Sequence, residues 1–483
     1  MDLSNKFSSN DILKDPKRFK RLFFFRMCGT GMGAAACLMK ERGYDVEGAD
    51  TFFYPPMSDY LKRTGIPCHD LHNVKKEFLQ SFDLIVVGNV VGRESEDARL
   101  IESLGVPFAS FPAALGALVL KNVNVVGIAG THGKTTTTWL ATQVFRNLGE
   151  DPGYLVGGVI DNQASAHSGN ERYFFIESDE YDSAYFEKIA KFRLYHLKNL
   201  ILTSLEYDHA DIYSSVEAIE NEFREVVPFV PDKVIINSGY ESCLKFFREY
   251  NGATKPLWTL YGEDTRVGPH SINTCANGSS FSMMLAGHEE IFETNLIGRH
   301  NIWNLSSIIL FAFMEGFSIT KIKTAVKNLG MVKRRQEERG RYHQALIVED
   351  FAHHPTAVAL TIEAIRAQYP GQKIIAALEP NSATSRSSLF ETEFANALAA
   401  ADGVILIRPA RHSSIKDHGD IDLKKVEEVI SSTKSIAVYV VDSLLSLRKT
   451  IDEFAVKNTI ILIMSNSTCF GLWESDFVSA LEK

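Results

Sequence analysis

The stretch from Asn124 to Leu148, NVVGIAGTHGKTTTTWLATQVFRNL, has the composition of a phosphate-binding turn between a strand and a helix. Asn124–Ala129 is apolar enough to form a buried strand, and Gly130–Gly133 has the composition of a turn. From Thr135 onward, apolar residues recur every four positions, as on one face of a helix. These residues are Leu140, Val144 and Leu148, with Ala141 and Phe145 beside them.

Such a turn presents several groups that attract anions. Its backbone N–H groups and the dipole of the following helix point at the same place, and Lys134 adds a positive charge. Thr135 offers a hydroxyl group to a magnesium ion. The pattern departs from the general G-x-x-x-x-G-K-[ST] loop, because Ile128 stands where the first glycine is required. The residues expected to contact phosphate are Gly130, Thr131, His132, Gly133, Lys134, Thr135 and Thr136. An ordinary glycine turn without a ligand is the structural alternative.

A second glycine-rich turn lies near the N-terminus. Residues 21–27 (RLFFFRM) predict a strand that runs into CGTGMGAAA, where Gly29, Gly31 and Ala34 fit G-x-G-x-x-A. Asp50 follows a second expected strand, as the acidic residue of a dinucleotide-binding fold does. The pattern predicts a site for a nicotinamide dinucleotide or for another diphosphate, since the same backbone geometry binds both.

Two further expected strands end in acidic and imidazole groups. They are Tyr173–Ile176 and Leu200–Thr203. The first is followed by Glu177, Asp179, Glu180 and Asp182, and the second by Glu206, Asp208, His209 and Asp211. In a parallel sheet the carboxyl ends of the strands share one edge with the phosphate turn, so we expect these groups to converge on it. Oxygen ligands beside phosphates suit magnesium, whereas solvated loop charges are the structural alternative.

Two later motifs place polar side chains at the ends of expected elements. Gly298–Phe311 (GRHNIWNLSSIILF) is a polar start followed by an apolar helix. Its residues His300, Asn301 and Asn304 are expected to cap this helix or, for the two asparagines, to read a nucleobase edge. A strand expected at Ala345–Val348 ends in Glu349, Asp350, Phe351, Ala352, His353, His354 and Pro355. The His-His-Pro turn indicates a structural or ligand-facing role, because no third metal ligand stands at a fixed spacing.

The composition is that of a globular protein with several domains. The chain has 483 residues, 45% of them hydrophobic and 23% charged, and this length exceeds one hydrophobic core. Its net charge of -9 argues against a nucleic-acid or acidic-membrane surface. No apolar run approaches a membrane span, and Met1–Lys20 is too polar for a signal peptide and is expected to be loosely held. The 6 cysteines lack C-x-x-C spacing, which predicts a reduced, cytoplasmic compartment with neither a disulfide framework nor a cysteine zinc site.

Alternating strands and helices predict an α/β fold with three domains. We expect a Rossmann-like N-terminal domain at 1–120, a central P-loop-type ATPase domain with a mostly parallel sheet at 121–330, and a C-terminal Rossmann-like α/β domain at 331–483. The third domain is expected to begin with a charge-rich junction, MVKRRQEERG, followed by a parallel sheet. Its further strands are expected at Lys373–Leu378, Val404–Ile407, Ala437–Val441 and Thr459–Met464, with the loops Glu379–Arg386 and Ser465–Gly471 at the ligand edge.

Together these motifs resemble the ATP-dependent Mur ligase family over nearly the whole chain. GTHGKTTT at Gly130, GRHNIWN at Gly298, KRRQE at Lys333 and DFAHHPT at Asp350 stand in the order and spacing of that family. The histidine in the turn and the His-His-Pro-Thr motif look like the branch that acts on UDP-N-acetylmuramate. Five further motifs favour the members of this branch that attach a preformed peptide. They are YPPMS at Tyr54, ESDEYDSAYFEKIAKF at Glu177, LEYDHADIY at Leu205, LEPNSATSR at Leu378 and MSNSTCFGL at Met464.

The resemblance implies a role for each set of residues. The first domain would bind the UDP-sugar through Gly29, Thr30, Gly31, Met32, Gly33 and Asp50. ATP would sit between the central and C-terminal domains, with Lys134 on its phosphates. The C-terminal domain would bind the peptide and close over ATP. Magnesium would be held by Thr135, Glu177 and His209. Asn301 and Asn304 would reach adenine and Arg335 the ribose or phosphates, while Asp350 with His353 would close over the triphosphate. The implied catalytic residues are thus Lys134, Glu177, His209, Asp350 and His353.

The implied reaction joins the lactyl carboxylate of UDP-N-acetylmuramate to the N-terminal amine of L-alanyl-γ-D-glutamyl-meso-diaminopimelate. It passes through an acyl phosphate and releases ADP and phosphate. No nucleic-acid or membrane partner is implied, and a monomer or weak homodimer is expected. The nearest alternative in the family is a ligase that adds L-alanine to the same sugar. Outside it, a nicotinamide-dependent oxidoreductase would leave GTHGKTT without a role, and a nucleotide-binding switch would use the turn without an amine substrate.

Two positions depart from the family pattern. Several members carry a carbamylated lysine after the LEYDH-type motif, but Arg224 stands at the corresponding place, so this modification is not expected here. Arg386 stands near the end of the EPNSATSR loop, where peptide-attaching members usually have lysine. Because the two cations differ in hydrogen-bond geometry, the ligand of Arg386 is left open.

Overall fold

The computed structural model describes residues 2–54, 57–158, 160, 163–250, 256–413, 415 and 418–482. The chain forms two compact units. Unit 1 comprises Met1–Glu206, Glu217–Gly268 and Leu305–Val326, and unit 2 comprises Tyr207–Val216, Pro269–Asn304 and Lys327–Lys483. The short segment Tyr207–Val216 therefore belongs with the C-terminal residues, although the chain on either side of it belongs to unit 1.

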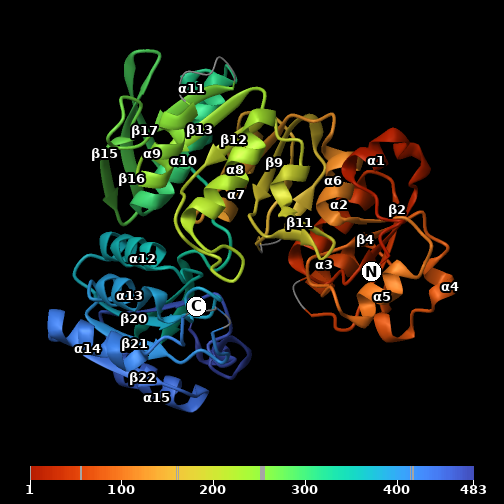
Figure 1. Ribbon diagram of the computed structural model, residues 1–483. Helices are drawn as coiled ribbons and strands as arrows, with labels where there is room; N and C mark the ends of the chain where they lie inside the picture. The colour runs from red at the N-terminus through yellow and green to blue at the C-terminus, as the bar shows by residue number, and fades with distance from the viewer. Residues whose placement is uncertain are drawn as a thin grey trace. The chain divides into compact units, whose positions relative to one another are not determined.

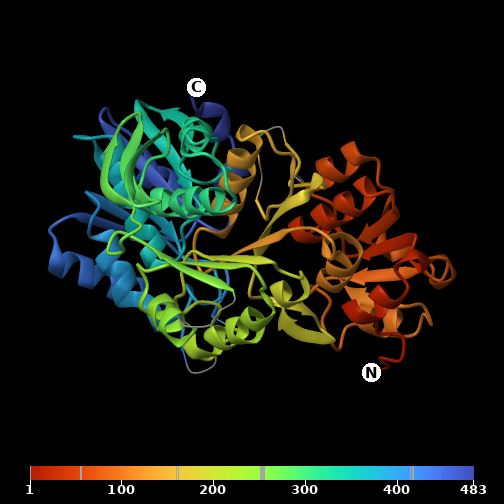
Figure 2. The ribbon, with the colours of Figure 1, turned by 90° about the horizontal axis from the view of Figure 1, so that it is seen from above.

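The first sheet of unit 1 is parallel, with the Rossmann-like strand order β3-β2-β1-β4-β5. Its strands are β1 (Arg21–Phe25), β2 (Asp45–Asp50), β3 (Cys68–Asp70), β4 (Leu84–Val87) and β5 (Phe108–Ser110). Helices lie on both faces of these red and orange strands (Figures 1 and 2). They are α1 (Ser9–Lys14), α2 (Thr30–Glu41), α3 (Met57–Thr64), α4 (Lys76–Leu79), α5 (Glu96–Glu102) and α6 (Phe111–Leu115). Two short 3-10 helices, η1 (Pro16–Arg18) and η2 (Leu71–Asn73), and one π-helix, η3 (Gly116–Leu120), accompany them. Alternate strand residues such as Phe23, Phe25 and Ile85 pack in one cluster with α4 and α5, as the period of a strand requires.

The expectation that Met1–Lys20 is loosely held is wrong for the described part of this segment. Ser8 and Asp11 form a capping box that starts α1, and Ile12 and Phe19 are fully buried. The backbone N–H of Phe7 donates to the Phe108 carbonyl oxygen at 2.8 Å. A few apolar residues spaced among polar ones thus attach the segment to the first sheet.

The second sheet of unit 1 has the order β14-β13-β12-β6-β9-β7-β8 and is parallel except for the β7 and β8 pair. Its strands are β6 (Val125–Ala129), β7 (Pro152–Leu155), β8 (Ala166–His167), β9 (Asn170–Ser178), β12 (Asn199–Leu202), β13 (Lys233–Asn237) and β14 (Leu257–Tyr261). A separate hairpin joins β10 (Asp182–Ala184) and β11 (Glu187–Ala190). The surrounding helices are α7 (Lys134–Asn147), α8 (Val216–Val226), α9 (Glu241–Tyr250), α10 (Arg299–Met314) and α11 (Ile319–Ala325), with η4 (Lys191–Leu194) and η5 (Val227–Phe229).

Helix α7 buries its predicted apolar face. Leu140, Val144 and Phe145 are fully buried. The Phe145 ring lies 4.7 Å from the Tyr173 ring and 4.8 Å from the Phe175 ring, both on β9. Aromatic contacts at these distances fix the helix on the sheet. The helix begins at Lys134, one residue earlier than predicted, so the lysine itself stands in its first turn.

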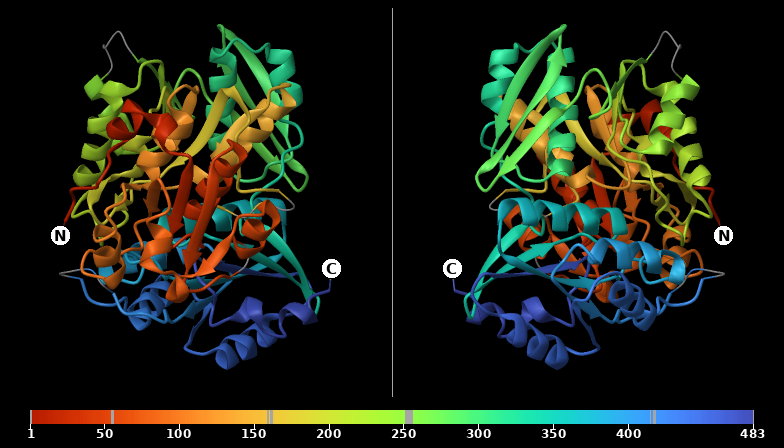
Figure 3. Two further views of the ribbon diagram at one scale, coloured as in Figure 1. Left: turned by 90° about the vertical axis from the view of Figure 1, so that its right-hand side faces the viewer. Right: turned by 90° about the vertical axis from the view of Figure 1, so that its left-hand side faces the viewer.

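Unit 2 contains an antiparallel sheet that the sequence reading did not predict. It consists of β15 (His270–Cys275), β16 (Gly278–Leu285) and β17 (His288–Thr294), visible as the long green strands in Figure 3. Phe281 and Phe292 face each other across β16 and β17 with ring centroids 5.8 Å apart. Most of the other side chains on β15 and β17 are only partly buried or exposed, which is why the segment lacked the apolar run of a core strand.

The other sheet of unit 2 has the order β18-β19-β23-β20-β21-β22. Its strands are β18 (Glu337–Tyr342), β19 (Ala345–Asp350), β20 (Lys373–Glu379), β21 (Gly403–Ile407), β22 (Ala437–Val441) and β23 (Thr459–Ser465). Helices α12 (Pro355–Gln368), α13 (Glu391–Leu398) and α14 (Leu423–Thr433) contribute to one buried cluster and α15 (Leu444–Phe454) to another. The short turns are η6 (Ser388–Phe390), η7 (Leu472–Glu474) and η8 (Val478–Ala480).

The prediction of a wholly parallel C-terminal sheet is wrong at one edge. Part of the expected charge-rich junction forms β18, which runs antiparallel to β19. Its charges are tolerated because an edge strand leaves side chains at the surface, and the Arg339 guanidinium reaches Glu349 on β19 at 2.8 Å. The α/β fold with mostly parallel sheets is otherwise confirmed, while the domain boundaries at 120 and 330 stay predictions. Among the described residues, no helix has the length and apolar character needed to cross a membrane.

Candidate functional site

The turn Gly130–Thr135, here called the phosphate turn, joins β6 to α7 in unit 1. Gly130 has φ 129° and Gly133 has φ 84°, values that favour glycine. A Cβ atom on Gly130 would lie 2.5 Å from Thr203 Oγ1 and 2.6 Å from the Ser204 carbonyl oxygen. Glycine is therefore required at position 130 both by its backbone angle and by the close approach of the residues that follow β12.

The residues after β12 hold the first half of the phosphate turn in place. The His132 N–H donates to Ser204 Oγ at 2.8 Å, and the Thr203 hydroxyl donates to the His132 carbonyl oxygen at 2.5 Å. The His132 imidazole Nε2 lies 2.9 Å from Glu206 Oε2. The sequence predicted that Glu206 lies at this edge of the sheet. It did not predict the contacts of Thr203 and Ser204 with the turn, because these depend on which loop lies beside it.

The second half of the turn is the N-terminus of α7. Gly133 is the capping residue, and within the described chain no side chain caps this helix. The first N–H groups of a helix have no partner inside it, and they carry the positive end of the helix dipole. The local geometry therefore fits a phosphate group, and the binding of phosphate by these residues stays a prediction.

Lys134 is held inside the turn by two acceptors. Its Nζ atom donates to the Gly130 carbonyl oxygen at 2.7 Å and to Glu180 Oε2 at 2.9 Å. Burial by itself lowers the pKa of Lys134, but the carboxylates of Glu180, Asp179 and Glu177 outweigh this effect and raise the pKa above its usual value. The ammonium group is thus charged at neutral pH.

Two of the three residues expected to bind magnesium lie in contact. The Thr135 hydroxyl donates to Glu177 Oε1 at 2.5 Å, and Glu177 Oε2 accepts the Gly157 N–H at 2.6 Å. A hydroxyl and a carboxylate are hard oxygen donors, so this pair fits magnesium. The third residue, His209, lies in unit 2.

His209 lies beside a buried carboxylate in unit 2. Asp208 is 4% exposed, and its Oδ1 accepts the His209 N–H at 2.7 Å. Burial by itself raises the pKa of Asp208, but the imidazoles of His209, His353 and His354 together with that N–H hold the pKa well below its usual value. Asp208 therefore brings the LEYDH motif and the His-His-Pro turn into one electrostatic cluster.

Asp350 is anchored by backbone donors in unit 2. Its Oδ2 accepts the Gln336 N–H at 2.8 Å, and its Oδ1 accepts the Ala352 N–H at 2.7 Å. Burial raises the pKa of Asp350, although the nearby Arg335 guanidinium opposes the shift. Arg335 lies over the Phe351 ring, 4.7 Å from its centroid. Arg335 therefore lies near Asp350, while the ligand roles expected of both residues stay predictions.

His353 and the start of α10 are also fixed by local bonds in unit 2. The His353 Nδ1 lies 2.9 Å from the Phe351 carbonyl oxygen. The Asn301 side-chain amide donates to the Ile297 carbonyl oxygen at 2.7 Å, and Asn301 and Asn304 are both buried. The His300 Nε2 lies 3.1 Å from the Gln336 side-chain nitrogen. One donor of Asn301 therefore stabilises the turn before the helix, in line with the structural alternative for this residue.

The glycine turn of the first domain, Cys28–Gly33, follows β1 and includes the first residues of α2. Thr30 is exposed and Met32 is buried. A Cβ atom on Gly33 would meet the Met57 side chain at 2.2 Å, so this glycine permits close helix packing. Asp50 Oδ2 accepts the Cys28 N–H at 2.8 Å. In this structure Asp50 braces the turn itself, a local role that the spacing pattern did not reveal.

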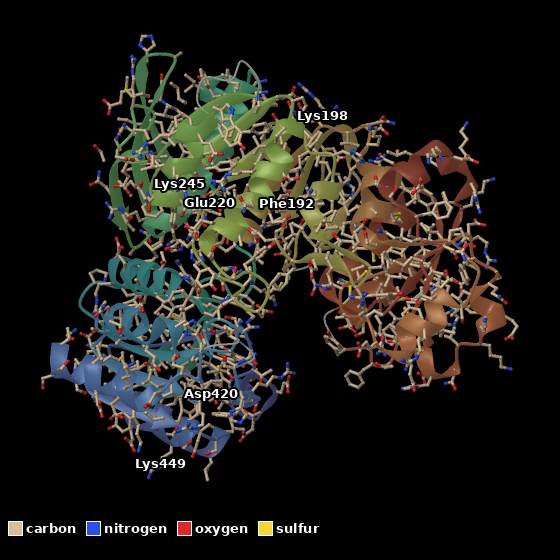
Figure 4. The ribbon with its side chains drawn as sticks, in the orientation of Figure 1. Phe192, Lys198, Glu220, Lys245, Asp420 and Lys449 are labelled. Carbon is tan, nitrogen blue, oxygen red and sulfur yellow. The ribbon has the colours of Figure 1, made fainter. Side chains whose placement is uncertain are left out.

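The two positions that depart from the family pattern are both engaged. The Arg224 guanidinium binds Glu220 and Glu249, each at 2.9 Å, and Lys245 also reaches Glu220 at 2.9 Å (Figure 4). The Arg224–Glu249 and Lys245–Glu220 pairs join α8 to α9. Arg386 donates through Nη1 to the Asn381 carbonyl oxygen at 2.7 Å, within its own loop.

Three domain models of one protein family match consecutive parts of the chain. Residues 22–122 match the Mur ligase family catalytic domain, residues 128–312 the Mur ligase middle domain and residues 334–467 the Mur ligase glutamate ligase domain. These matches follow the order of the three sequence segments described above.

Individual relatives agree with this assignment. The chain is 35% identical to the UDP-N-acetylmuramate–L-alanyl-γ-D-glutamyl-meso-2,6-diaminoheptandioate ligase of Escherichia coli, over 81% of this chain and 85% of the relative. It is 29% identical to the UDP-N-acetylmuramate–L-alanine ligase of Streptococcus sanguinis, over 88% of this chain and 92% of the relative. The crystal structure of a murein peptide ligase from Psychrobacter arcticus is similar, with 27% identity, a TM-score of 0.67, and coverage of 95% of this chain and 98% of the other. The chain therefore belongs to the Mur ligase family.

Proposed function

We propose that this chain is an ATP-dependent ligase that joins UDP-N-acetylmuramate to L-alanyl-γ-D-glutamyl-meso-diaminopimelate in peptidoglycan recycling. The observation that carries the proposal is the phosphate turn, with charged Lys134 inside it and Thr135 bonded to Glu177. The choice of a tripeptide as the incoming group follows the relative at 35% identity. A ligase for L-alanine is the second candidate, since relatives with that name reach 29% identity over a similar length.

The chemistry requires an activated carboxylate, because a free carboxylate is a poor electrophile. The γ-phosphoryl group of ATP moves to the lactyl carboxylate, which gives an acyl phosphate and ADP. The amine of the peptide then attacks the carbonyl carbon, the C–N bond forms, and phosphate leaves as the amine loses a proton. The ammonium of Lys134 and the N–H groups at the start of α7 neutralise negative charge on the transferred group.

The hydroxyl of Thr135 and the carboxylate of Glu177 support the proposal that magnesium binds here, because both are hard oxygen donors. Thr135 and Glu177, with His209 from unit 2, would hold the ion. When bound, it would neutralise charge on the phosphates of ATP. Glu180 accepts from Lys134 in the structure, and in the reaction its carboxylate would keep the lysine charged.

The remaining predicted residues take their proposed roles from the family pattern. The UDP-sugar would bind at the glycine turn through Gly29, Thr30, Gly31, Met32, Gly33 and Asp50. Asn301 and Asn304 would contact adenine, Arg335 the ribose or phosphates, and Asp350 with His353 the triphosphate. We place the reaction in the cytoplasm, where ATP is available. We propose that the protein is a monomer or a weak homodimer. The boundaries between its three domains are proposed near residues 120 and 330.

One phosphate-release assay tests the proposal. Purified protein is given ATP, magnesium and UDP-N-acetylmuramate with either the tripeptide or L-alanine. We expect phosphate release that depends on the tripeptide. Release with L-alanine alone would support the second candidate, and ATP hydrolysis that ignores both amines would indicate a nucleotide-binding switch. Hydride transfer with a nicotinamide cofactor would indicate an oxidoreductase.

A further inference from the structure

Two aromatic side chains stand exposed just beyond the carboxyl end of β2 in unit 1. Phe52 is 70% exposed and Tyr54 is 49% exposed. Their rings stack with centroids 6.1 Å apart and an angle of 23° between the planes. Large aromatic rings that stay in water do not gain the favourable free energy of burying their apolar surface. A stacked exposed pair of this kind, here called the aromatic pair, indicates a ligand with a flat apolar face.

The aromatic pair is attached to the glycine turn. β1 and β2 are parallel neighbours with Phe25 opposite Ala49, so their carboxyl ends adjoin. The Tyr54 N–H donates to Cys28 Sγ at 3.4 Å, and the Cys28 thiol donates to the Tyr54 carbonyl oxygen at 3.7 Å. In Rossmann-like domains the phosphates lie at the first turn and the nucleoside extends toward the end of the second strand. The pair lies where a nucleobase would arrive.

The acidic residue at this strand end is already engaged. Asp50 accepts the N–H groups of Cys28 and Thr51, both at 2.8 Å, and lies 3.8 Å from the Arg26 guanidinium. A carboxylate with these partners braces the turn and keeps acceptor sites for the sugar part of the ligand. The exposed ring faces next to it are left for the base.

The spacing of the two rings decides how a base can bind. A base inserted between them needs two van der Waals separations of about 3.5 Å, or roughly 7 Å in all. The observed centroid distance of 6.1 Å is smaller. The pair thus acts as one platform, with Tyr54 behind Phe52 and the base on the outer face.

We propose that Phe52, supported by Tyr54, is the stacking platform for the uracil ring of the UDP-sugar; this inference rests on the proposed function. Stacking on an aromatic ring needs only a flat base and no particular hydrogen-bonding edge. The platform therefore supplies affinity for the nucleoside, while the choice of uracil belongs to other groups.

The test compares ligands with and without the base. Calorimetric titration uses UDP-N-acetylmuramate, UDP and N-acetylmuramic acid 1-phosphate, which lacks uridine. Phe52→Ala should weaken binding of the first two about tenfold, a typical effect of losing one stacking ring, and should leave the third unchanged. Phe229→Ala is the matched control, because Phe229 is 80% exposed elsewhere in unit 1. Equal weakening of all three ligands, or no weakening, overturns the platform.

A fluorescent variant gives a second readout. In Phe52→Trp the new indole keeps a flat face, so binding of UDP should persist and should quench the added tryptophan emission. N-acetylmuramic acid 1-phosphate should leave that emission unchanged. Emission that ignores UDP while UDP still binds overturns the platform. Thermal unfolding of both variants should match the wild type, because the Phe52 ring is mostly exposed.

The wild-type protein separates this inference from the proposed function. Binding of UDP without any ligation overturns the proposed function and leaves the platform to be judged by the titrations. Ligation by the wild type together with unchanged UDP affinity in Phe52→Ala overturns the platform alone. A wild-type chain that does not bind UDP overturns both.

Discussion

Lys134 and Glu180 form a buried ion pair within unit 1, with the lysine Nζ 2.9 Å from Glu180 Oε2 and the two side chains only 12% and 3% exposed. The same Nζ donates to the Gly130 carbonyl oxygen. Both bonds hold the ammonium at the mouth of the phosphate turn. Because the ammonium is already held in place, it can stabilise charge on a phosphoryl group without further reorganisation of the surroundings.

Lys134→Ala should therefore abolish most phosphate release while leaving UDP-sugar binding intact. Loss of one preorganised charge at a transition state reduces kcat by about 100- to 1000-fold. Lys188→Ala is the control, because Lys188 is a mostly exposed lysine that pairs with Asp182 in the same unit. Phosphate release is followed at saturating substrates, and UDP-sugar affinity by calorimetry. Unchanged turnover in Lys134→Ala would contradict the role of the lysine.

Glu177→Ala should sharply raise the magnesium concentration needed for half-maximal activity. Glu177 is bonded to the Thr135 hydroxyl, and its removal takes away a hard oxygen donor from the proposed ion site. Glu171→Ala is the matched control, since Glu171 lies on the same strand and its side chain is 69% exposed. Activity is titrated with magnesium at fixed ATP. Superimposable curves for wild type and Glu177→Ala would remove Glu177 from the metal site.

Gly130→Ala should disturb the phosphate turn more than a comparable substitution elsewhere. Gly130 combines φ 129° with neighbours at 2.5 and 2.6 Å, whereas Gly43 has φ 89° and open space around it. Comparing the two alanine variants separates steric overlap from backbone strain. We expect Gly43→Ala to cost about 1 kcal/mol in unfolding free energy through strain alone, and Gly130→Ala to cost more and to weaken ATP binding. Equal thermal shifts and unchanged ATP affinity would show that the turn tolerates a side chain.

Asp402 should make the stability of unit 2 depend on pH in the acid range. Its Oδ2 accepts from Arg366 at 2.7 Å and from the Ile374 N–H at 2.9 Å. Burial by itself raises the pKa of Asp402, but these donors outweigh it and lower the pKa below 3.8. A lowered folded pKa means that the stabilisation is present above pH about 4 and is lost as the pH falls through the folded value.

The variant Asp402→Asn checks this sign. Because the pair is about one third exposed, we expect a loss of only about 1 kcal/mol at pH 7. The measurement is urea unfolding monitored in unit 2. The difference in unfolding free energy between Asp402→Asn and the wild type should shrink as the pH is lowered below about 4. A difference that grows with acid would mean that the carboxylate is not stabilised in its charged form.

The sequence predicted the strands that are buried on both faces, because such strands are continuous apolar runs. The observed strands Gly403–Ile407 and Thr459–Ser465 are buried throughout, and each extends the predicted strand by one residue. It missed the sheet of β15, β16 and β17, whose outer strands β15 and β17 expose polar side chains. It also missed helix α1, where Ile12 stands among polar residues. Elements that are stabilised by a few long-range contacts show little of the apolar periodicity from which a helix or strand is predicted.

The site divides in the same way. The phosphate turn was predictable because its glycines, lysine and threonine are consecutive and each residue type has a local reason. Other contacts join segments that are far apart in sequence and were not predicted. Thr203 and Ser204 bond to His132 of the phosphate turn. In unit 2, the Ala210 N–H donates to Thr384 Oγ1 at 3.0 Å. Asp50 shows the opposite case, since its spacing suggested a ligand while its carboxylate braces the backbone of its own turn.

Glu379→Gln should loosen the loop that follows β23 in unit 2. Glu379 is 1% exposed, and its Oε2 accepts both the Ser465 hydroxyl at 2.6 Å and the Cys469 N–H at 2.9 Å. Cys469 and Phe470 have φ values of 49° and 57°, a left-handed conformation that non-glycine residues rarely adopt. The charged hydrogen bonds hold this strained turn, and a hydrogen bond to a charged group contributes about 1.5–3 kcal/mol.

The loop was expected at the ligand edge of the C-terminal sheet. On the hypothesis that it lines the peptide site, its loosening should act on the peptide alone. We expect the KM for the tripeptide to rise about five- to tenfold in Glu379→Gln, a loss within the range of one such hydrogen bond, while the KM for ATP stays unchanged. Glu428→Gln, at an exposed position on α14, is the control. Equal increases for ATP and tripeptide would instead indicate a general loss of folded protein, which the thermal unfolding curve of the same variant would reveal.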